Sequence, residues 1–235
     1  MKDTKIPAAT ILRLSVYYHH LEDLMNKGTK VICSSDLASQ TNVNAAQLRK
    51  DLSYFGKFGT RGVGYDVSSL IDQIRNALSL QEVTRMVVIG CGCIGKTFLK
   101  NDYLKNRGYT CIAAFDSDAD NLEKDLSAEI PFYSMDGLGH FLSEYAVDVA
   151  IIAVPPDEAQ QVADEISPHV RAILNFSPVR IKVPDHITVQ YVDFSVLLDS
   201  LVYNMNSKQK GSRDSVGRRP QKWTHHHSWP VTANA

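Results

Sequence analysis

One stretch of glycines has the spacing of a phosphate-binding turn. Gly90, Gly92 and Gly95 form a GxGxxG motif that follows the apolar segment RMVVI and opens a helical stretch. Asp116 ends the next apolar segment, at about the 20-residue spacing that a dinucleotide fingerprint requires. In this context the glycines let the backbone approach a pyrophosphate at a helix N-terminus. The motif therefore predicts a dinucleotide site; a glycine turn used only for helix–strand packing is the alternative.

The residue that ends the second predicted strand also indicates which dinucleotide binds. An acidic side chain such as Asp116 binds ribose hydroxyls and repels a 2′-phosphate, and "FDSD" offers no arginine for that phosphate. NAD(H), as NADH or NAD+, is therefore favoured over NADP(H).

Further candidate cofactor contacts follow the later apolar strands. The carboxyl ends of parallel strands are where ligands bind. Proline, however, is also common after a strand that binds no ligand. The predicted cofactor contacts are Gly90, Cys91, Gly92, Cys93, Ile94, Gly95, Asp116, Val154, Pro155, Asn175, Phe176, Ser177 and Pro178.

No constellation of residues indicates catalysis. The sequence shows no nucleophile elbow and no metal-spaced cluster, and His140, His169 and His186 stand apart. Cys91 and Cys93 are interpreted as small residues of the turn, although a thiol near a helix N-terminus can be redox-active. A dehydrogenase usually needs a substrate domain, and residues 81–205 suffice only for a nucleotide domain. We predict that the chain is not an enzyme and has neither catalytic residues nor a metal.

A second set of candidate residues is basic and lies near the N-terminus. Asn44 can cap a helix, with Gln47 as its capping-box partner, and a glycine-rich segment predicted to form a tight hairpin follows. Gln47 with Arg49 or Lys50 would meet base edges, and the hairpin cations would meet phosphates or the minor groove. The predicted DNA contacts are Gln47, Arg49, Lys50, Ser53, Tyr54, Lys57, Thr60, Arg61 and Gly62. A solvated charged surface is the alternative for any one of them.

The elements that must position these residues fall into two units. Residues 1–80 show a helix, a short helix, a capped helix, a hairpin and a helix, an order typical of a winged helix-turn-helix. Over residues 85–192 five apolar strands alternate with helical segments, which predicts a Rossmann-type parallel sheet covered on both faces. The predicted fold class is α/β, with an N-terminal winged helix-turn-helix followed by a Rossmann-type nucleotide-binding domain.

Charge divides the chain in the same way. Residues 1–80 carry ten Lys and Arg against seven Asp and Glu, and residues 81–205 carry nine against eighteen. A mildly basic N-terminal unit followed by an acidic second unit suggests that the two units have different partners. Residues 206–235 are polar and basic without periodicity, and are predicted to be disordered.

Composition and cysteine usage indicate a cytoplasmic protein without a membrane partner. The chain is 44% hydrophobic and 22% charged, as in ordinary globular proteins, and no apolar run approaches a membrane span. The N-terminus lacks the features of a signal peptide, and the four cysteines lack disulfide-framework spacing.

Taken together, these segments resemble the Rex family of bacterial redox-sensing transcriptional repressors. The stretch "QLRKDLSYFGKFGTRGVGYD" is similar to that family's recognition helix and wing. Five further segments of this chain are similar, in the same order, to the nucleotide domain of that family: "VVIGCGCIG", "AAFDSD", "DVAIIAVP", "ILNFSPVRIKVP" and "VDFSVLL". The resemblance covers Ile6 to Leu201. It implies a homodimer that binds operator DNA in the presence of NAD+ and is released by NADH.

The same resemblance implies a set of switch and dimer residues. A C-terminal helix at 193–205 would be swapped onto the partner, with Phe194 approaching the partner's nicotinamide pocket. His19 stands where the family usually has an arginine that pairs with the position of Asp193, and a histidine there makes the switch weaker or pH-sensitive. Tyr103 is the nearest candidate, out of register, for the switch tyrosine. The alternatives are a small NAD-dependent oxidoreductase and a coenzyme A or nucleotide-binding protein with a basic N-terminal module.

Overall fold

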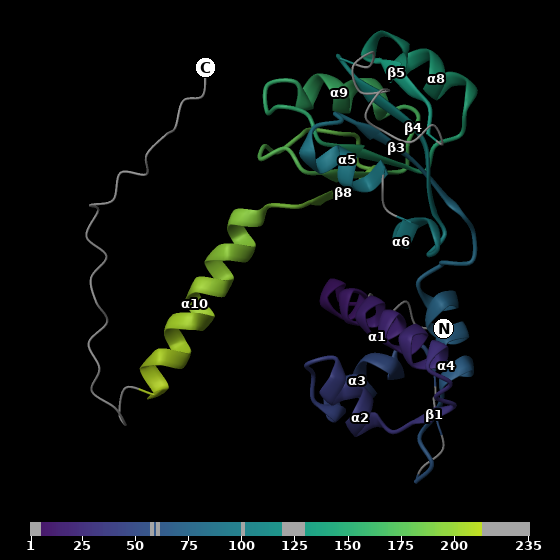
Figure 1. Ribbon diagram of the computed structural model, residues 1–235, viewed down its shortest axis with the longest axis vertical. Coiled ribbons are helices and arrows are strands. Elements are labelled where there is room, and N and C mark those ends of the chain that lie inside the picture. Colours follow the sequence, from purple (N-terminus) through teal and green to yellow (C-terminus); the bar gives the residue numbers. More distant parts are fainter. Residues whose placement is uncertain (1–5, 57–58, 60–61, 100–101, 119–129, 213–235) are drawn as a thin grey trace, which may run out of the picture.

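The chain folds into two units (Figure 1): the first has one hydrophobic core, and the second has two, on opposite faces of its sheet. The computed structural model describes residues 6–56, 59, 62–99, 102–118 and 130–212. The predicted DNA contacts Lys57, Thr60 and Arg61 lie outside this described part of the chain.

The N-terminal unit is a small helical domain with a two-stranded sheet. Its elements are α1 (Ala8–Asn26), β1 (Val31–Ile32), α2 (Ser34–Gln40), α3 (Ala45–Ser53), β2 (Tyr65–Asp66) and α4 (Val67–Ala77). The apolar positions of α1 fall on one face and are buried at Leu14, Tyr17 and Leu21, where they meet buried residues of α3 and α4. The helix order is the one the sequence predicts.

The start of α3 is fixed by a cap. The side chain of Asn44 accepts a hydrogen bond from the backbone N–H of Gln47 at 2.8 Å, so the predicted N-cap is confirmed. Leu48 and Leu52 then anchor the helix in the core. Its opposite face is left to solvent.

The predicted hairpin within the glycine-rich segment takes a different form. Strand β2 pairs antiparallel with β1, with Ile32 opposite Tyr65, so its partner is the earlier "KVIC" segment. Gly64 has a φ of 110°, and a Cβ there would lie 2.6 Å from the carbonyl oxygen of Ile32. The close approach of the two strands therefore requires this glycine.

The second unit is a six-stranded, fully parallel sheet. Its elements are β3 (Thr84–Ile89), α5 (Cys93–Leu99), α6 (Asp102–Lys105), β4 (Tyr109–Asp116), β5 (Phe132–Ser134), the 3-10 helix η1 (Met135–Gly137), α8 (Leu138–Glu144), β6 (Val149–Ile152), α9 (Ala159–Ile166), β7 (Ala172–Asn175) and β8 (Thr188–Tyr191). The strand order β5-β4-β3-β6-β7-β8 is that of dinucleotide-binding domains. The five predicted strands are present; β5 was not predicted, because three residues carry no recognisable pattern.

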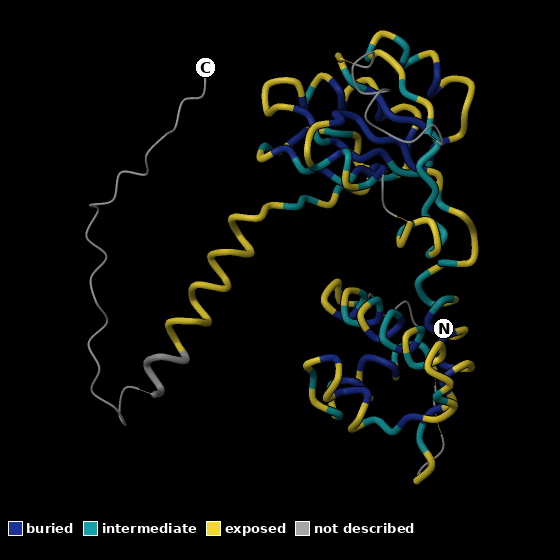
Figure 2. Tube along the Cα trace, in the orientation of Figure 1, coloured by how far each residue is buried: buried dark blue, intermediate teal, exposed yellow. Residues whose placement is uncertain are grey.

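Alternate residues of the strands pack into two hydrophobic cores on opposite faces of the sheet. Val87, Ile89 and Phe115 pack with α8 and α9, whereas Met86 and Val88 pack on the other face with Leu99 of α5. The sheet is buried on both sides, as Figure 2 shows in dark blue. Continuous apolar strands are what such a two-sided environment requires.

The last helix stands away from both units. Helix α10 (Phe194–Ser212) projects from the end of β8, and all its described side chains through Ser207 are exposed (Figures 1 and 2). It ends at Ser212 rather than at 205, so the first residues of the tail predicted to be disordered are helical. Within the described ranges, no helix is both long and apolar enough to span a membrane.

Candidate nucleotide and DNA sites

The glycine turn after β3 has three distinct local geometries. A Cβ on Gly90, whose φ is 89°, would lie 2.6 Å from the carbonyl oxygen of Ala153, and a Cβ on Gly95 would lie 2.0 Å from that of Gly90. These two glycines are therefore required by packing. A Cβ on Gly92 would meet nothing within 4 Å. The middle glycine faces open space, which fits the approach of a pyrophosphate to the backbone.

The turn lies where the order of the strands reverses. From β3 the chain proceeds to β4 on one side, while β6 lies on the other. In open parallel sheets, ligands bind in the crevice outside the carboxyl ends of strands at this reversal. Gly90 directly follows β3 and Ala153 directly follows β6, so the predicted turn lies at this position.

Asp116 is held beside the turn by two backbone groups. Its Oδ2 accepts a hydrogen bond from the N–H of Cys91 at 2.6 Å, and its Oδ1 accepts one from Asp118 at 2.9 Å. An ionised carboxylate accepts about four hydrogen bonds, so both oxygens keep capacity for ribose hydroxyls. The site fits an adenosine ribose without a phosphate.

Two of the predicted cofactor contacts use their polar atoms within the protein. Asn175 is fully buried; its Nδ2 donates to the carbonyl of Val179 at 3.0 Å, and its Oδ1 accepts from the N–H of Ser177 at 2.9 Å. The hydroxyl of Ser177 donates to the carbonyl of Val154. Side-chain contact by Asn175 or Ser177 with a cofactor is thus disfavoured. Asn175 holds the loop after β7, and Ser177 joins that loop to the one after β6.

The other residues predicted at this edge offer apolar surface. Pro155 and Pro178 are exposed, and Ile94 is half-buried. The ring of Phe176 lies 5.3 Å from that of Phe98 and 6.3 Å from that of Phe194. Phe194 thus lies near this edge even within its own chain.

Burial makes the internal thiols unreactive. Burial, and next the negative charge of Asp116, raise the pKa of Cys91 to about 12, and burial raises the pKa of Cys111 to about 12. Both thiols are protonated near neutral pH, which disfavours the redox-active alternative for Cys91. Cys93 is exposed at the start of α5.

The outer face of α3 carries one exposed stripe. Ala46, Arg49, Lys50 and Ser53 are exposed and follow helical spacing, while Tyr54 is half-buried. Arg49 donates to the hydroxyl of Ser34 at 3.1 Å, which ties it to the start of α2. Ala46 was missed in the sequence; its only signal is its position one turn before Lys50, and a methyl group there suits contact with a thymine methyl.

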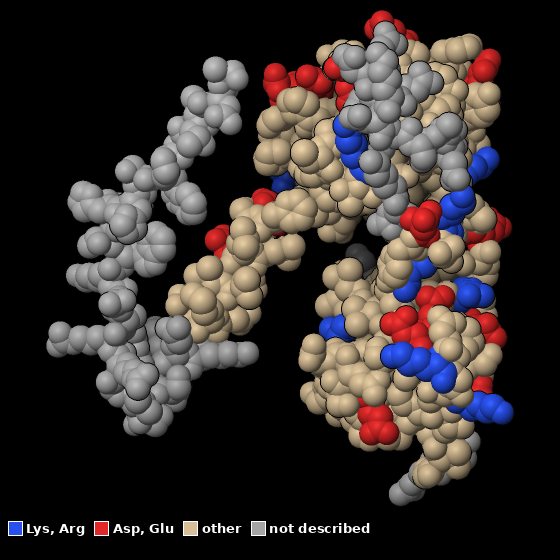
Figure 3. All heavy atoms as spheres, in the orientation of Figure 1, with Lys and Arg blue, Asp and Glu red and all other residues tan. Residues whose placement is uncertain are grey.

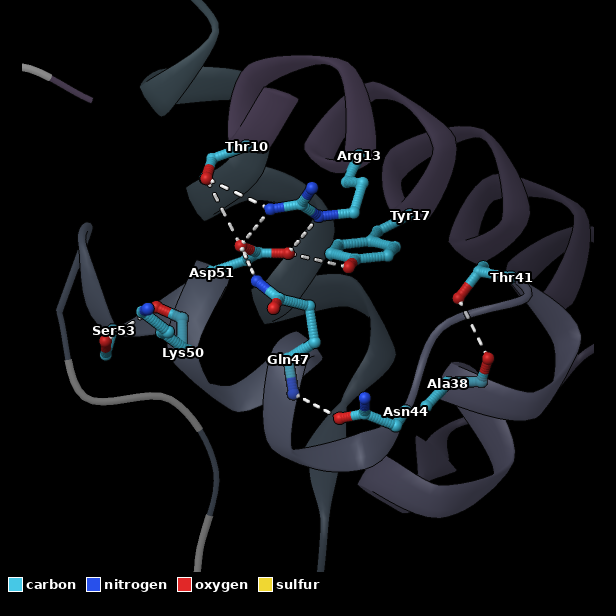
Figure 4. A network of polar contacts seen from close by, with 10 residues as sticks. All are labelled: Thr10, Arg13, Tyr17, Ala38, Thr41, Asn44, Gln47, Lys50, Asp51 and Ser53. Atoms are coloured by element: carbon cyan, nitrogen blue, oxygen red, sulfur yellow. Dashed lines mark hydrogen bonds and ion pairs between the residues drawn. The ribbon is translucent and has the colours of Figure 1, made fainter. Parts of the chain in front are cut away.

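Gln47 has a different position from the one predicted. Its Nε2 donates to Oδ1 of Asp51 at 2.8 Å, so its amide points into the domain rather than toward a base edge (Figure 4). Asp51 is fully buried and also accepts from Arg13 and Tyr17 of α1. The sequence prediction overlooked Asp51, because its partner Arg13 lies far away in the chain.

The carboxylate of Asp51 is held in its charged form. Burial by itself raises the pKa of Asp51, but hydrogen bonds from Arg13, Tyr17 and Gln47 outweigh it and lower the pKa from 3.8 to about 2. The hydrogen bond to Asp51 raises the pKa of Arg13.

This lowered pKa predicts a pH-dependent stability. A shift of this size contributes roughly 2 kcal/mol to the free energy of unfolding; the contribution is complete above the unfolded pKa and is lost as the pH falls through the folded value. The destabilisation caused by Asp51→Asn should therefore be largest near pH 7 and shrink between pH 4 and pH 2, as measured by urea unfolding. Asp23→Asn, an exposed change on α1, is the control. If Asp51→Asn lowered the free energy of unfolding by the same amount at every pH, the lowered pKa of Asp51 would be contradicted.

Helix α1 also contacts the nucleotide-binding unit. Arg107 Nη1 lies 3.1 Å from Oε2 of Glu22, and the guanidinium of Arg107 lies 4.1 Å from the ring centre of Tyr103. The ring of His19 lies 6.5 Å from that of Tyr103. Two of the predicted switch residues are thus neighbours across the domain boundary. Asp193 lies at the start of α10, where it accepts from the N–H and the hydroxyl of Ser195.

Known proteins share this arrangement along most of the chain. Residues 5–53 match the family model described as "Putative DNA-binding protein N-terminus", and residues 81–179 match "CoA binding domain". The chain is 42% identical to the redox-sensing transcriptional repressor Rex of Syntrophobacter fumaroxidans, over 88% of this chain and 99% of that protein. It is 40% identical to Rex of Exiguobacterium sibiricum, over 86% and 93% respectively. The chain belongs to the Rex family of redox-sensing transcriptional repressors.

Solved Rex-family structures carry the same fold. The repressor RSP in complex with β-NADH superposes with a TM-score of 0.78 at 27% identity, covering 90% of this chain and 99% of that chain. RSP with β-NAD+ and operator DNA superposes with a TM-score of 0.79 at 28% identity, covering 92% and 100%. The predicted winged-helix and Rossmann fold is confirmed. The prediction that this chain is not an enzyme is also confirmed, because its Rex relatives are transcriptional repressors.

Proposed function

We propose that this chain represses transcription as a homodimer bound to operator DNA and is released when NADH occupies its glycine turn, so that it reports the NADH/NAD+ ratio. The observation that carries the proposal is that one chain contains both a helix-turn-helix and a glycine turn of dinucleotide-binding geometry. This turn lies where the order of the strands reverses. RSP, which shares this fold, binds NADH in one structure, and NAD+ with operator DNA in another. A DNA-bound repressor of this type acts in the cytoplasm.

The cofactor site consists of the turn and one carboxylate. The Gly90–Gly95 turn would take the pyrophosphate, and Asp116 the adenosine ribose. Coenzyme A is the second candidate, because residues 81–179 match a CoA-binding model. Its adenosine ribose carries a phosphate, which the Asp116 carboxylate would repel. This favours NADH and NAD+.

DNA would be bound by the exposed stripe of α3 and the segment that follows it. Arg49, Lys50 and Ser53 face outward, and Tyr54 lies beside them. Lys57, Thr60, Arg61 and Gly62 would extend the contact to phosphates or the minor groove.

Helix α10 supplies the dimer contact. Its exposed apolar side chains are Phe194, Val196, Leu197, Leu198, Leu201, Val202, Tyr203 and Met205. Most of them fall on one side of the helix, and the residues after Asp199 that are not grey in Figure 3 include no Lys, Arg, Asp or Glu. A helix of this kind needs a partner surface. A second copy that exchanges the same helix covers both stripes and brings two recognition helices to one operator.

Coupling between the two sites runs through α1. NADH shifts the dimer only if it binds one arrangement better than the other. Helix α1 holds α3 through Asp51 and meets the nucleotide-binding domain through Glu22 and Arg107. A rotation of one domain against the other therefore changes the position of the recognition helix.

Reciprocity between the ligands tests the proposal. If NADH weakens operator binding, operator DNA must weaken NADH binding by the same factor. We expect the Kd for NADH to rise about tenfold or more on addition of an operator selected by the protein from a random DNA library. Scrambled DNA of equal length is the control. An NADH affinity unaffected by saturating operator would refute the proposed coupling.

A further inference from the structure

A buried carboxylate lies in the middle of the DNA-facing helix. Asp51 is 0% exposed, while its neighbours Lys50 and Ser53 face solvent. An exposed acidic side chain on this helix would repel phosphates, whereas Asp51 points away from the DNA-facing stripe, toward α1 (Figure 4). Its role is therefore directed at the other helix.

Asp51 receives donors from two helices at once. From α1, Arg13 donates through Nε at 2.6 Å and Nη2 at 2.7 Å, the hydroxyl of Tyr17 at 2.9 Å, and that of Thr10 at 3.2 Å. Gln47 of α3 adds its amide at 2.8 Å. The guanidinium binds both carboxylate oxygens, and such a fork fixes orientation as well as distance.

The apolar contacts of α3 do not provide that orientation. Leu48 and Leu52 bury the helix against the core, but hydrophobic contacts are non-directional. The directional contacts that limit rotation of this nine-residue helix are polar: the exposed hydrogen bond from Arg49 to Ser34 of α2, and the buried fork from Arg13. The fork from Arg13 opposes this rotation, which would move Arg49 and Lys50 relative to the DNA.

We propose that Asp51 and Gln47 are positioning residues for operator recognition: Asp51 sets the rotation of α3 against α1, and Gln47 supports Asp51 rather than reading a base. This inference rests on the proposed function, because it requires α3 to be the recognition helix. It assigns base reading to the exposed stripe alone.

Base reading and positioning differ in their effect on a set of operators. Loss of a base-reading side chain removes the preference at one base pair. Loss of a positioning residue lowers affinity for the operator while keeping the pattern of preferences, and leaves the phosphate contacts that set the salt dependence.

The test uses the full-length dimer with NAD+ and the selected operator, varied one base pair at a time. We expect Asp51→Asn to lower operator affinity about tenfold or more, equivalent to one good contact, and Gln47→Ala to lower it less. Both should keep the wild-type pattern of base preferences and the wild-type salt slope. Asp23→Asn should match wild type, and Lys50→Ala, a change within the exposed stripe, should remove the preference at one base pair.

Two further measurements distinguish unfolding of a variant from a specific loss of operator binding. Circular dichroism and NADH affinity should match wild type in the Asp51 and Gln47 variants at the assay temperature. Should Asp51→Asn unfold, Arg13→Lys takes its place, since it keeps the charge but not the fork and should also lose operator affinity.

Two results would overturn the positioning role. One is a Gln47→Ala protein that loses preference at a single base pair; the other is a folded Asp51→Asn or Arg13→Lys protein with wild-type operator affinity. A wild-type protein without preference for any DNA sequence would overturn the proposed function itself, and the inference with it.

Discussion

Replacing Gly95 by alanine is expected to weaken NADH binding strongly and to destabilise the nucleotide-binding domain. The added Cβ would lie 2.0 Å from the carbonyl oxygen of Gly90, a backbone atom that no rotamer change can remove. Helix α5 must then move away from β3, at a cost of about 1–3 kcal/mol or more, as in other overpacked cores. Its N-terminal N–H groups leave the position where the pyrophosphate would bind, so we expect NADH affinity to fall about 100-fold or more.

Two matched glycine substitutions separate packing from binding. Gly92→Ala meets nothing within 4 Å, so its stability should stay within about 0.5 kcal/mol of wild type, while NADH affinity falls because the methyl group occupies the predicted ligand space. Gly137→Ala, which also meets nothing and lies outside the turn, should change neither. Fluorescence titration with NADH and thermal unfolding measure the two quantities. Wild-type NADH affinity in both Gly95→Ala and Gly92→Ala would exclude this turn as the cofactor site.

Replacing Leu201 by glutamate is expected to dissociate the dimer. Leu201 is 63% exposed and lies within the apolar stripe of α10, so dimer formation must bury it. A charge buried without a partner costs several kcal/mol, and it is introduced once in each copy. We expect monomers at micromolar concentration in sedimentation velocity. Operator affinity should fall about 100-fold or more, because a monomer contacts only one half-site.

Ser200→Glu is the matched control for this change. Ser200 is the preceding residue of α10 and points away from the apolar stripe, so the same charge should leave the dimer intact. A Leu201→Glu protein that sediments as a dimer would show that α10 is not the dimer contact.

The parts of the structure that follow from nearby residues could be predicted from the sequence. The glycine turn, Asp116 and the cap at Asn44 each depend on a pattern within a few residues or within one βαβ unit. The pairing of Tyr65 with Ile32 was missed because the partner strand lies well before the glycine-rich segment. The two-residue strands carry too little pattern to predict a register.

The buried polar contacts were harder to predict for the same reason. Asp51 and Arg13 are 38 residues apart, and nothing in the periodicity of either helix joins them. Gln47 was assigned to the DNA surface because helical spacing places it on one face with Lys50 and Tyr54. The contact between the Ser177 hydroxyl and Val154 likewise depends on β6 lying beside β7. Helix α10 continues to Ser212 although the sequence after Asn206 lacks an apolar period, because Lys and Gln favour helix without burial.

The central claim is that NADH bound at the glycine turn releases the operator. The most direct measurement is the fraction of selected operator bound by the dimer during titration with NADH, NAD+ or NADPH, followed by fluorescence anisotropy. Release is predicted for NADH alone, with NAD+ compatible with the complex and NADPH excluded by Asp116. An operator complex that persists when NADH saturates the protein would contradict the claim.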